Sequence, residues 1–279
     1  LSLFPVTGLV TDRIVLPGPA GFDGPPLARA ARLRVDVDPF SLVRGRLSIT
    51  RLEIERLEIH LVRLENGRAS WEGLATETRG RASGGTLLPA GLTVAGIALK
   101  DAALTWTDHA GDRASRVRDL SLSLEDLSPD EPSDMALSFV ALSDRPELEA
   151  ETRVKGRLTL RRDGTGALFE DLRLEVDARG TALPRGPARL ELSSAVEADW
   201  ETGSLQIDGL QGSLDGTAVR GWVHLEDLSR PALSFDLDLG SVDLDARRSS
   251  IRPKEAKTAG PDSATGGAGI PPILKHVEA

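Results

Sequence analysis

The fold is decided by residues 148–161, which read LEAETRVKGRLTLR. Apolar or small residues occupy the even positions, from Leu148 to Leu160, and charged or polar residues occupy the odd positions, from Glu149 to Arg161. Successive side chains of a β-strand point to opposite faces of the sheet. This alternation therefore predicts a strand with one apolar face and one solvated face.

The same alternation recurs along the chain. It is clear at 171–177, where Leu172, Leu174 and Val176 alternate with acidic and basic residues, and again at 233–239. Helical spacing is not sustained over any long stretch, so we expect only short helical turns, at Pro39–Arg44 and Pro271–His276. Further strands are predicted near Arg32–Val37, Leu47–Leu64 with a break around Glu55, Leu92–Leu99, Ala103–Thr107, Val117–Leu124, Met135–Leu142, Ala188–Trp200, Leu205–Leu210 and Ala218–Leu225.

Turn signals separate several of these strands. Asn66-Gly67, Asp163-Gly164 and Asp215-Gly216 are pairs whose residues tolerate the positive φ of tight hairpins. Short connections of this kind join antiparallel neighbours. The sequence therefore predicts an all-β protein built as a long antiparallel meander.

The composition argues against several classes of function and site. The 279 residues carry a formal net charge of -9, and Lys and Arg are interleaved with acids, which argues against nucleic-acid binding. There is no Cys, so disulfides, thiolate zinc sites and thiol nucleophiles are excluded. No stretch approaches the roughly 20 apolar residues that a membrane-spanning helix needs. Aromatic residues make up only 4%, so any core is mainly aliphatic.

The motifs of common active sites are missing. The four histidines, His60, His109, His224 and His276, fall in separate elements and share no metal-binding spacing. No G-x-S-x-G elbow and no P-loop occur. Alternate acids such as Asp236 and Asp238 share one face of a strand, so we interpret these pairs as a solvated outer surface. We predict a protein that is not an enzyme and has no cofactor or metal.

The composition also suggests how the chain is divided. We predict a β module over residues 1–76, a polar linker or loop over 77–90, a continuing β-sheet over 91–246, a disordered linker over 247–269, and the start of a following element at 270–279. The linker predictions rest on Glu77–Gly85 and Arg247–Gly269, which hold many Gly, Ser, Pro and charged residues and few large apolar ones.

Several motifs, in their order along the chain, resemble the AsmA family. Pro19-Ala20-Gly21-Phe22 is similar to a Pro-x-Gly-Phe turn, and VDVDPFSLVRGR at 35–46 is similar to a strand, a short helix and a Gly before the next strand. Residues 49–71 follow the pattern I-x-x-L-x-I-x-x-L-x-I-x-L-x-R and end in G-x-x-x-W, with Ser70 where Asn is frequent. AALTWTD at 102–108 and FDLDLGSVDLD at 235–245 also resemble family segments, although Ala246-Arg247 replaces an aromatic residue that often follows.

The resemblance, which touches most of residues 9–245, implies a place and a role. It implies a periplasmic protein, tethered to the inner membrane by a helix ahead of this sequence. It also implies an elongated, curved sheet whose apolar groove takes phospholipid acyl chains and contributes to phospholipid transport between inner and outer membranes and to outer-membrane biogenesis. Partners would be phospholipid acyl chains, both membranes through parts of the protein outside this sequence, and envelope proteins.

Candidate groove residues follow from the alternation. They are the apolar positions of four predicted strands: Val154, Leu158, Leu160, Leu172, Leu174, Val176, Leu190, Leu192, Leu233, Phe235, Leu237 and Leu239. Two alternatives stay open. The strands could form an ordinary β-sandwich whose two sheets cover each other, or the protein could be a scaffold that assists outer-membrane protein assembly and carries no lipid.

Overall fold

One twisted sheet contains every strand of the chain that the computed structural model describes, which is residues 7–240 except 20, 23, 45–46, 72–91, 184 and 228–231. All of these residues fall in a single unit, Leu1–Ser241. The strands and the one helix of the described residues have the following bounds: β1 Thr7–Leu16, β2 Ala28–Val37, α1 Pro39–Val43, β3 Leu47–Glu55, β4 Glu58–Arg63, β5 Leu92–Val94, β6 Ile97–Asp108, β7 Arg113–Leu124, β8 Ser133–Asp144, β9 Glu147–Leu160, β10 Gly166–Arg179, β11 Ala188–Asp199, β12 Ser204–Leu214, β13 Thr217–Leu225 and β14 Leu233–Leu239.

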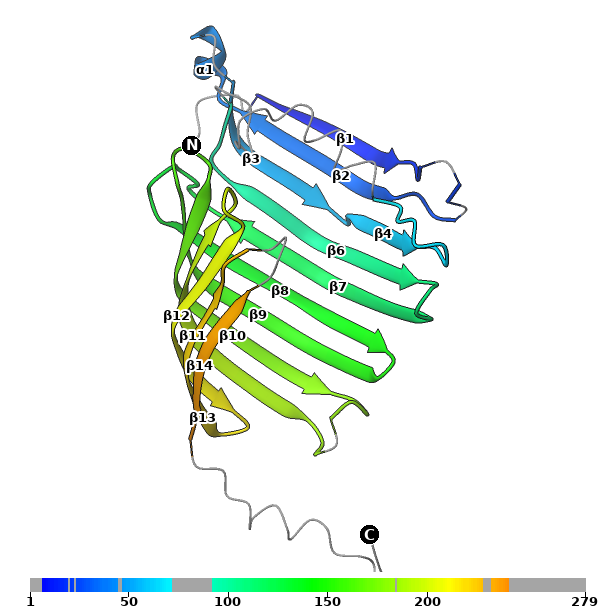
Figure 1. Ribbon diagram of the computed structural model, residues 1–279. Coiled ribbons are helices and arrows are strands. Elements are labelled where there is room, and N and C mark those ends of the chain that lie inside the picture. The colour runs from blue at the N-terminus through cyan, green and yellow to red at the C-terminus, as the bar shows by residue number, and fades with distance from the viewer. Residues whose placement is uncertain are drawn as a thin grey trace, which may run out of the picture. The chain divides into compact units, whose positions relative to one another are not determined.

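The predicted meander is confirmed from β6 to β14, where each strand pairs antiparallel with the next (Figure 1). The predicted break near Glu55 is confirmed as well, because β3 ends there and β4 begins at Glu58. β3 and β4 lie between β2 and β6 and run parallel to β6, and β5 pairs parallel with β3. This parallel section was not predicted, since alternation fixes which face a side chain occupies but not the direction of pairing.

The apolar rows stay on one face because many strands contain a β-bulge. In β6 the residues Ile97 and Leu99 share a face with Ala102 and Leu104, although an unbroken strand would place the two pairs on opposite faces. Asp101, at φ 51°, is the extra residue that restores the facing. The same positive φ occurs at Arg13 in β1, Asp119 in β7, Asp171 in β10 and Gly209 in β12.

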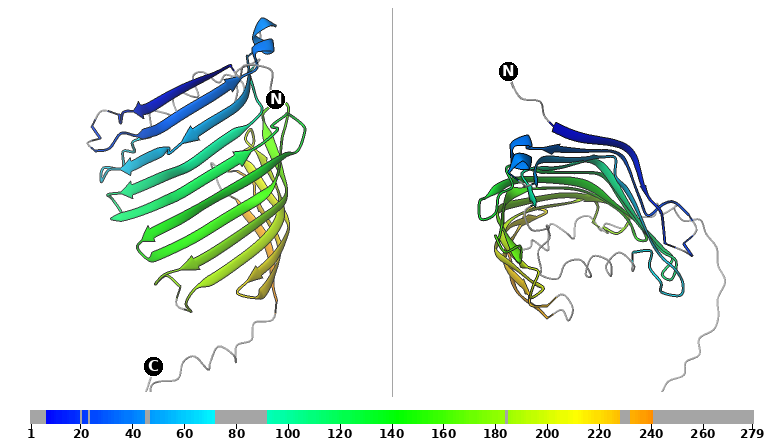
Figure 2. Two further views of the ribbon diagram at one scale, coloured as in Figure 1. Left: turned by 180° about the vertical axis from the view of Figure 1, so that it is seen from behind. Right: turned by 90° about the horizontal axis from the view of Figure 1, so that it is seen from above.

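The sheet is bent as well as twisted. Seen from above, it forms an arc, with the later strands facing back toward the earlier ones across its concave side (Figure 2). No second sheet packs against it within the described residues. The expectation of a curved sheet is therefore confirmed, and a two-sheet sandwich is absent from the part of the chain that the structure describes.

Buried apolar side chains are few, and most are alanines. The main buried cluster contains Leu124, Leu158 and Ala167, with partly buried residues packed around it. One of these is Leu127, from the loop between β7 and β8, whose amide donates to the Ala95 carbonyl at 2.6 Å. This loop therefore covers one end of the apolar face of β6–β10.

The short helix predicted at Pro39–Arg44 is confirmed as α1. The predicted helical turn at Pro271–His276 and the linkers at Glu77–Gly85 and Arg247–Gly269 lie outside the described residues. The domain boundaries at 76, 90, 246 and 269 stay predictions, although β4 and β5, the strands before and after the proposed 77–90 linker, belong to one sheet.

Candidate functional site

The strand register brings the twelve candidate residues onto one face of the sheet, which we call the inner face. In the middle of the sheet, Val154, Leu174 and Leu192 lie opposite one another across β9, β10 and β11. Val176 lies opposite Leu190 in the same way. Leu158, Leu160 and Leu172 join this face through neighbouring positions of β9 and β10.

The four candidates of β14 continue this surface. Phe235 lies opposite Val223 of β13, which lies opposite Ile207 of β12, which in turn lies opposite Val196 of β11. Leu233, Leu237 and Leu239 occupy the same face of β14. One apolar surface therefore extends from the middle strands to the last described strand.

Burial differs strongly among the twelve. Leu158 is only 6% exposed because it belongs to the covered cluster. Leu237 is 43% exposed and Phe235 is 59% exposed. The described inner face is thus open over its last strands and covered near the loop between β7 and β8.

The inner face also includes residues that the candidate list missed. They come chiefly from β4, β6, β7, β8, β12 and β13: Ile59, Leu61, Ile97, Leu99, Leu104, Trp106, Val117, Leu122, Met135, Leu137, Phe139, Leu205, Ile207, Val219 and Val223. Their alternation is visible in the sequence. The alternation is interrupted by bulges at Asp101, Asp119 and Gly209. An Asp or Gly between two alternating runs is the signal that both runs occupy the same face, and it would have identified these residues.

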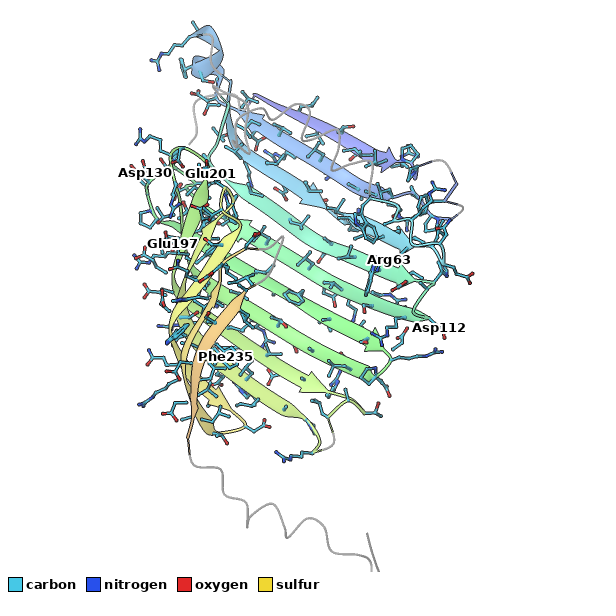
Figure 3. The ribbon with its side chains drawn as sticks, viewed as in Figure 1. Arg63, Asp112, Asp130, Glu197, Glu201 and Phe235 are labelled. Carbon is cyan, nitrogen blue, oxygen red and sulfur yellow. The ribbon has the colours of Figure 1, made fainter. Side chains whose placement is uncertain are left out.

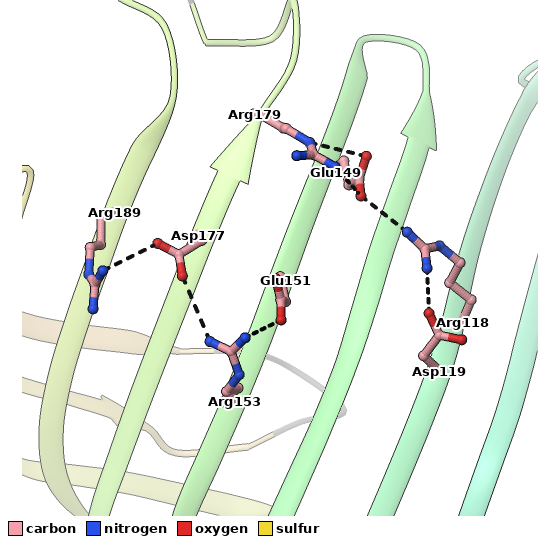
Figure 4. A network of polar contacts seen from close by, with 8 residues as sticks. All are labelled: Arg118, Asp119, Glu149, Glu151, Arg153, Asp177, Arg179 and Arg189. Carbon is pink, nitrogen blue, oxygen red and sulfur yellow. Dashed lines mark hydrogen bonds and ion pairs between the residues drawn. The ribbon is translucent and has the colours of Figure 1, made fainter.

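The opposite, outer face is charged. Figure 4 shows two groups of ion pairs on β7, β9, β10 and β11; in one of them Arg118 and Arg179 both contact Glu149, at 3.2 and 2.9 Å. In the other group Arg153 and Arg189 both contact Asp177, each at 3.9 Å. The hydrogen bond from Arg179 lowers the pKa of the Glu149 carboxyl. Exposed pairs such as these contribute little stability each, but they keep this face solvated.

The outer face is the convex one. In Figure 4 the later strands pass behind the sheet as the ion pairs are viewed from in front. Figure 3 shows Glu197 on the outside of the bend and Phe235 on its inner side. The aliphatic surface therefore lines the concave side.

One group of charges on the outer face is shielded from solvent. Glu53 of β3 and Asp36 of β2 are both buried, and Glu53 pairs with Lys100 and with Arg51. The hydrogen bond from Lys100 lowers the pKa of Glu53. Asp36 pairs with Arg34 at 2.9 Å. Asp36 thus departs from the expectation that the alternate acids are solvated, because strands β1–β3 crowd around it.

The three histidines within the described residues lie in different parts of the sheet. His60 is in β4 and His109 follows β6, while His224 in β13 contacts Asp208 at 2.9 Å and stacks near Trp222 at 4.6 Å between ring centroids. His276 lies outside the described residues. Among the residues that the structure describes, no three His, Cys, Asp or Glu side chains form a group that could hold a metal ion.

The surface with the clearest chemical character is therefore an aliphatic inner face with few polar groups. Such a surface can bind hydrocarbon chains through apolar contact, and it does not fix their register by hydrogen bonds. No described helix has the length and apolar character needed to cross a membrane.

Comparison with known proteins gives one match. The family model described as "AsmA family" matches residues 1–175, which is 175 of the 279 residues and runs from the N-terminus into β10. No curated protein matches the chain. No solved structure matches it either.

Proposed function

Because this chain belongs to the AsmA family, we propose that it is a noncatalytic module that binds and conducts phospholipid acyl chains in the periplasm, between inner and outer membranes. The family is associated with the cell envelope. In this proposal the chain contributes to lipid supply of the outer membrane and does no chemistry on its cargo.

A single observation carries the proposal. Large aliphatic side chains continue from strand to strand along the concave face, and no opposing layer covers them within the described residues. Exposed apolar surface of this extent is costly in water and marks a binding surface in soluble proteins. An alkyl chain is a chemically suitable cover for it.

The energetics suit transport. Each methylene removed from water contributes about 0.8 kcal/mol, so a diacyl lipid with some thirty methylenes meets a barrier on the order of 20 kcal/mol when it crosses water alone. The inner face would remove most of this barrier. Because acyl chains are equally dry in a bilayer and against leucines, binding relative to the membrane would be close to thermoneutral.

The dimensions also suit acyl chains. β9 has fourteen residues, which corresponds to about 46 Å at about 3.3 Å per residue. One leaflet of a bilayer holds its acyl chains within about 15 Å, half of the hydrocarbon thickness. The inner face is therefore wide enough for acyl chains to lie either along the strands or across them.

Photo-crosslinking from matched positions tests the proposal. A photoreactive amino acid replaces Leu192 on the inner face in one variant and the adjacent Glu191 on the outer face in another. The variants are expressed in bacteria that have an inner and an outer membrane, and the purified protein is examined by mass spectrometry. We expect phospholipid adducts at 192 and none at 191. Equal labelling at both positions, or protein adducts alone at 192, would refute lipid carriage.

One observation favours the alternative, a scaffold that binds an envelope protein without lipid. Every residue of β14 is exposed, and among the described residues β14 pairs only with β13. An open edge can accept a strand from a partner. In that case the photoreactive residue at 192 would give no lipid adduct, and one at Leu237 would capture a protein.

A further inference from the structure

The helix α1 presents apolar side chains to solvent at one corner of the sheet. Val43 is 88% exposed and Phe40 is 55% exposed, and Arg44, also exposed, follows directly. In Figures 1 and 2, α1 projects beyond the ends of the neighbouring strands. These three residues, Phe40, Val43 and Arg44, are referred to below as the α1 tip.

The α1 tip is held in place rather than frayed. The Ser41 hydroxyl donates to the Asp38 carbonyl at 2.7 Å and accepts from the Ser48 amide at 3.2 Å, so it joins the beginning of the helix to β3. The Asp38 carboxylate accepts from the Phe40 amide at 3.0 Å, and the Asp38 amide donates to the Ser48 carbonyl. Ser41 itself is buried. These bonds fix the direction in which the α1 tip points.

We propose that the α1 tip is a contact site for a phospholipid bilayer surface. Two apolar side chains beside a guanidinium match the boundary between acyl chains and headgroups, because Phe and Val can enter the apolar side while arginine reaches the phosphates. The charge is distinctive, since the chain as a whole carries a net charge of -9 and a second arginine, Arg46, follows in the sequence. A three-residue tip of this kind gives weak, reversible attachment.

The position of α1 confines the contact to this corner. Other connections at the same end of the sheet lie below α1, among them those that hold Asp130 and Glu201 (Figure 3). The charge of Asp130 is balanced by Arg162 at 2.7 Å, whereas Arg44 follows two exposed apolar side chains and would be attracted to an anionic surface. The protein would therefore meet the bilayer with α1 first and with the start of the inner face, at Val37 and Ile49, close behind it.

The absence of cysteine allows a direct test. Val43→Cys and the control Val15→Cys each receive one environment-sensitive fluorophore. Val15 is a fitting control because it is 59% exposed, is also a valine, and lies on the outer face at the opposite end of β1. With vesicles of phosphatidylcholine and phosphatidylglycerol, we expect blue-shifted emission, and quenching by brominated lipid, at 43 and not at 15.

Binding measurements give the magnitude. We expect Phe40→Asp with Val43→Asp to weaken vesicle flotation about tenfold or more, because both apolar contacts are lost. Arg44→Glu should weaken binding to anionic vesicles about fivefold. Val15→Asp should leave binding unchanged. Because Val43 is exposed, its variant should keep the wild-type thermal midpoint, which checks folding.

The outcomes are separable from those for lipid carriage. Equal emission at 43 and 15, or unchanged flotation of the double variant, would overturn the proposal. Capture of a protein at 43 with no response to vesicles would overturn it in favour of a protein contact. Lipid adducts at 192 report on the inner face alone, so either idea can fail while the other holds.

Discussion

The inner face has two regions of similar composition and different burial. Around Leu124 and Leu158, aliphatic side chains are covered by one another and by Leu127 from the loop between β7 and β8. On β14, leucines with the same facing are exposed, because that strand has a neighbour on one side only. The difference teaches that alternation determines which face a residue occupies, whereas neighbours in space determine whether it stabilises the fold or is free to bind.

The largest expected effect comes from removing volume in the covered region. Leu158→Ala should lower the free energy of unfolding by about 2 to 3 kcal/mol, since it loses apolar burial and leaves a cavity. Leu237→Ala, at 43% exposure, should cost less than about 1 kcal/mol. Urea unfolding followed by circular dichroism measures both. Equal losses would mean that the two regions are packed alike.

The next effect addresses how β14 is attached. A Cβ atom at Gly221 of β13 would lie 1.9 Å from the Asp236 carbonyl oxygen, and its φ of +153° disfavours other residues. Gly221→Val should therefore detach β14 locally, at a cost of about 1 to 3 kcal/mol. Hydrogen exchange should rise for residues 233–239 and stay unchanged around Leu158. The control is Gly18→Ala, where the nearest atom is 3.8 Å away. Unchanged exchange on β14 would contradict the expected clash.

A third experiment compares a buried and an exposed carboxylate on the outer face by their contributions to the free energy of unfolding. Glu53→Gln should cost about 1 to 2 kcal/mol at neutral pH, because the buried carboxylate loses its charged hydrogen bond from Lys100. Glu151→Gln, which affects an exposed pair with Arg153, should cost less than about 0.5 kcal/mol.

The pH dependence of Glu53 has a definite sign. The folded protein lowers the pKa of this carboxyl below the ordinary value of 4.5, so its stabilisation is present above that value and is lost as the pH falls through the lowered pKa. Wild-type stability should therefore decline more steeply in acid than that of Glu53→Gln. Parallel curves from urea titrations at several pH values would show that the ion pair has no such role.

The smallest effect on stability should accompany a large effect on binding. Leu237→Asp places a charge on the exposed part of the inner face, so we expect the free energy of unfolding to change by about 0.5 kcal/mol or less. Copurifying phospholipid should nevertheless fall sharply, because a carboxylate is costly beside an acyl chain. Undiminished lipid in mass spectrometry of solvent extracts would indicate that cargo does not reach β14.

Much of the fold could be predicted because each strand has its own local signal. Residues 148–161 predicted β9 almost to the residue, and the short helix at Pro39 followed from local sequence. β1 was missed, because Arg13, with a φ of 56°, lies between two short apolar runs that do not continue one alternation. The parallel pairing of β4 with β6 was missed as well, since it depends on the path of the connecting chain.

The candidate site was predictable in its facing and not in its exposure. The twelve named residues share one face, as the alternation indicated. Leu158 nevertheless lies in the covered cluster, because its cover comes from Leu127, thirty-one positions earlier in the sequence. The α1 tip could not be recognised from the sequence alone, since the local sequence of a short helix does not determine which of its apolar residues are packed against a neighbour.

The β-bulges restrict where insertions and deletions can be accepted during evolution of this sequence. Removing one residue from the interior of a strand, such as Asp171 from β10, would turn Leu168 and Phe169 to the opposite sides relative to Leu172 and Leu174. Single insertions and deletions inside strands should therefore be rare among functional descendants, except where a second change in the same strand restores the facing. Changes in length should instead collect in the hairpin connections, where an added residue leaves the facing of both strands intact.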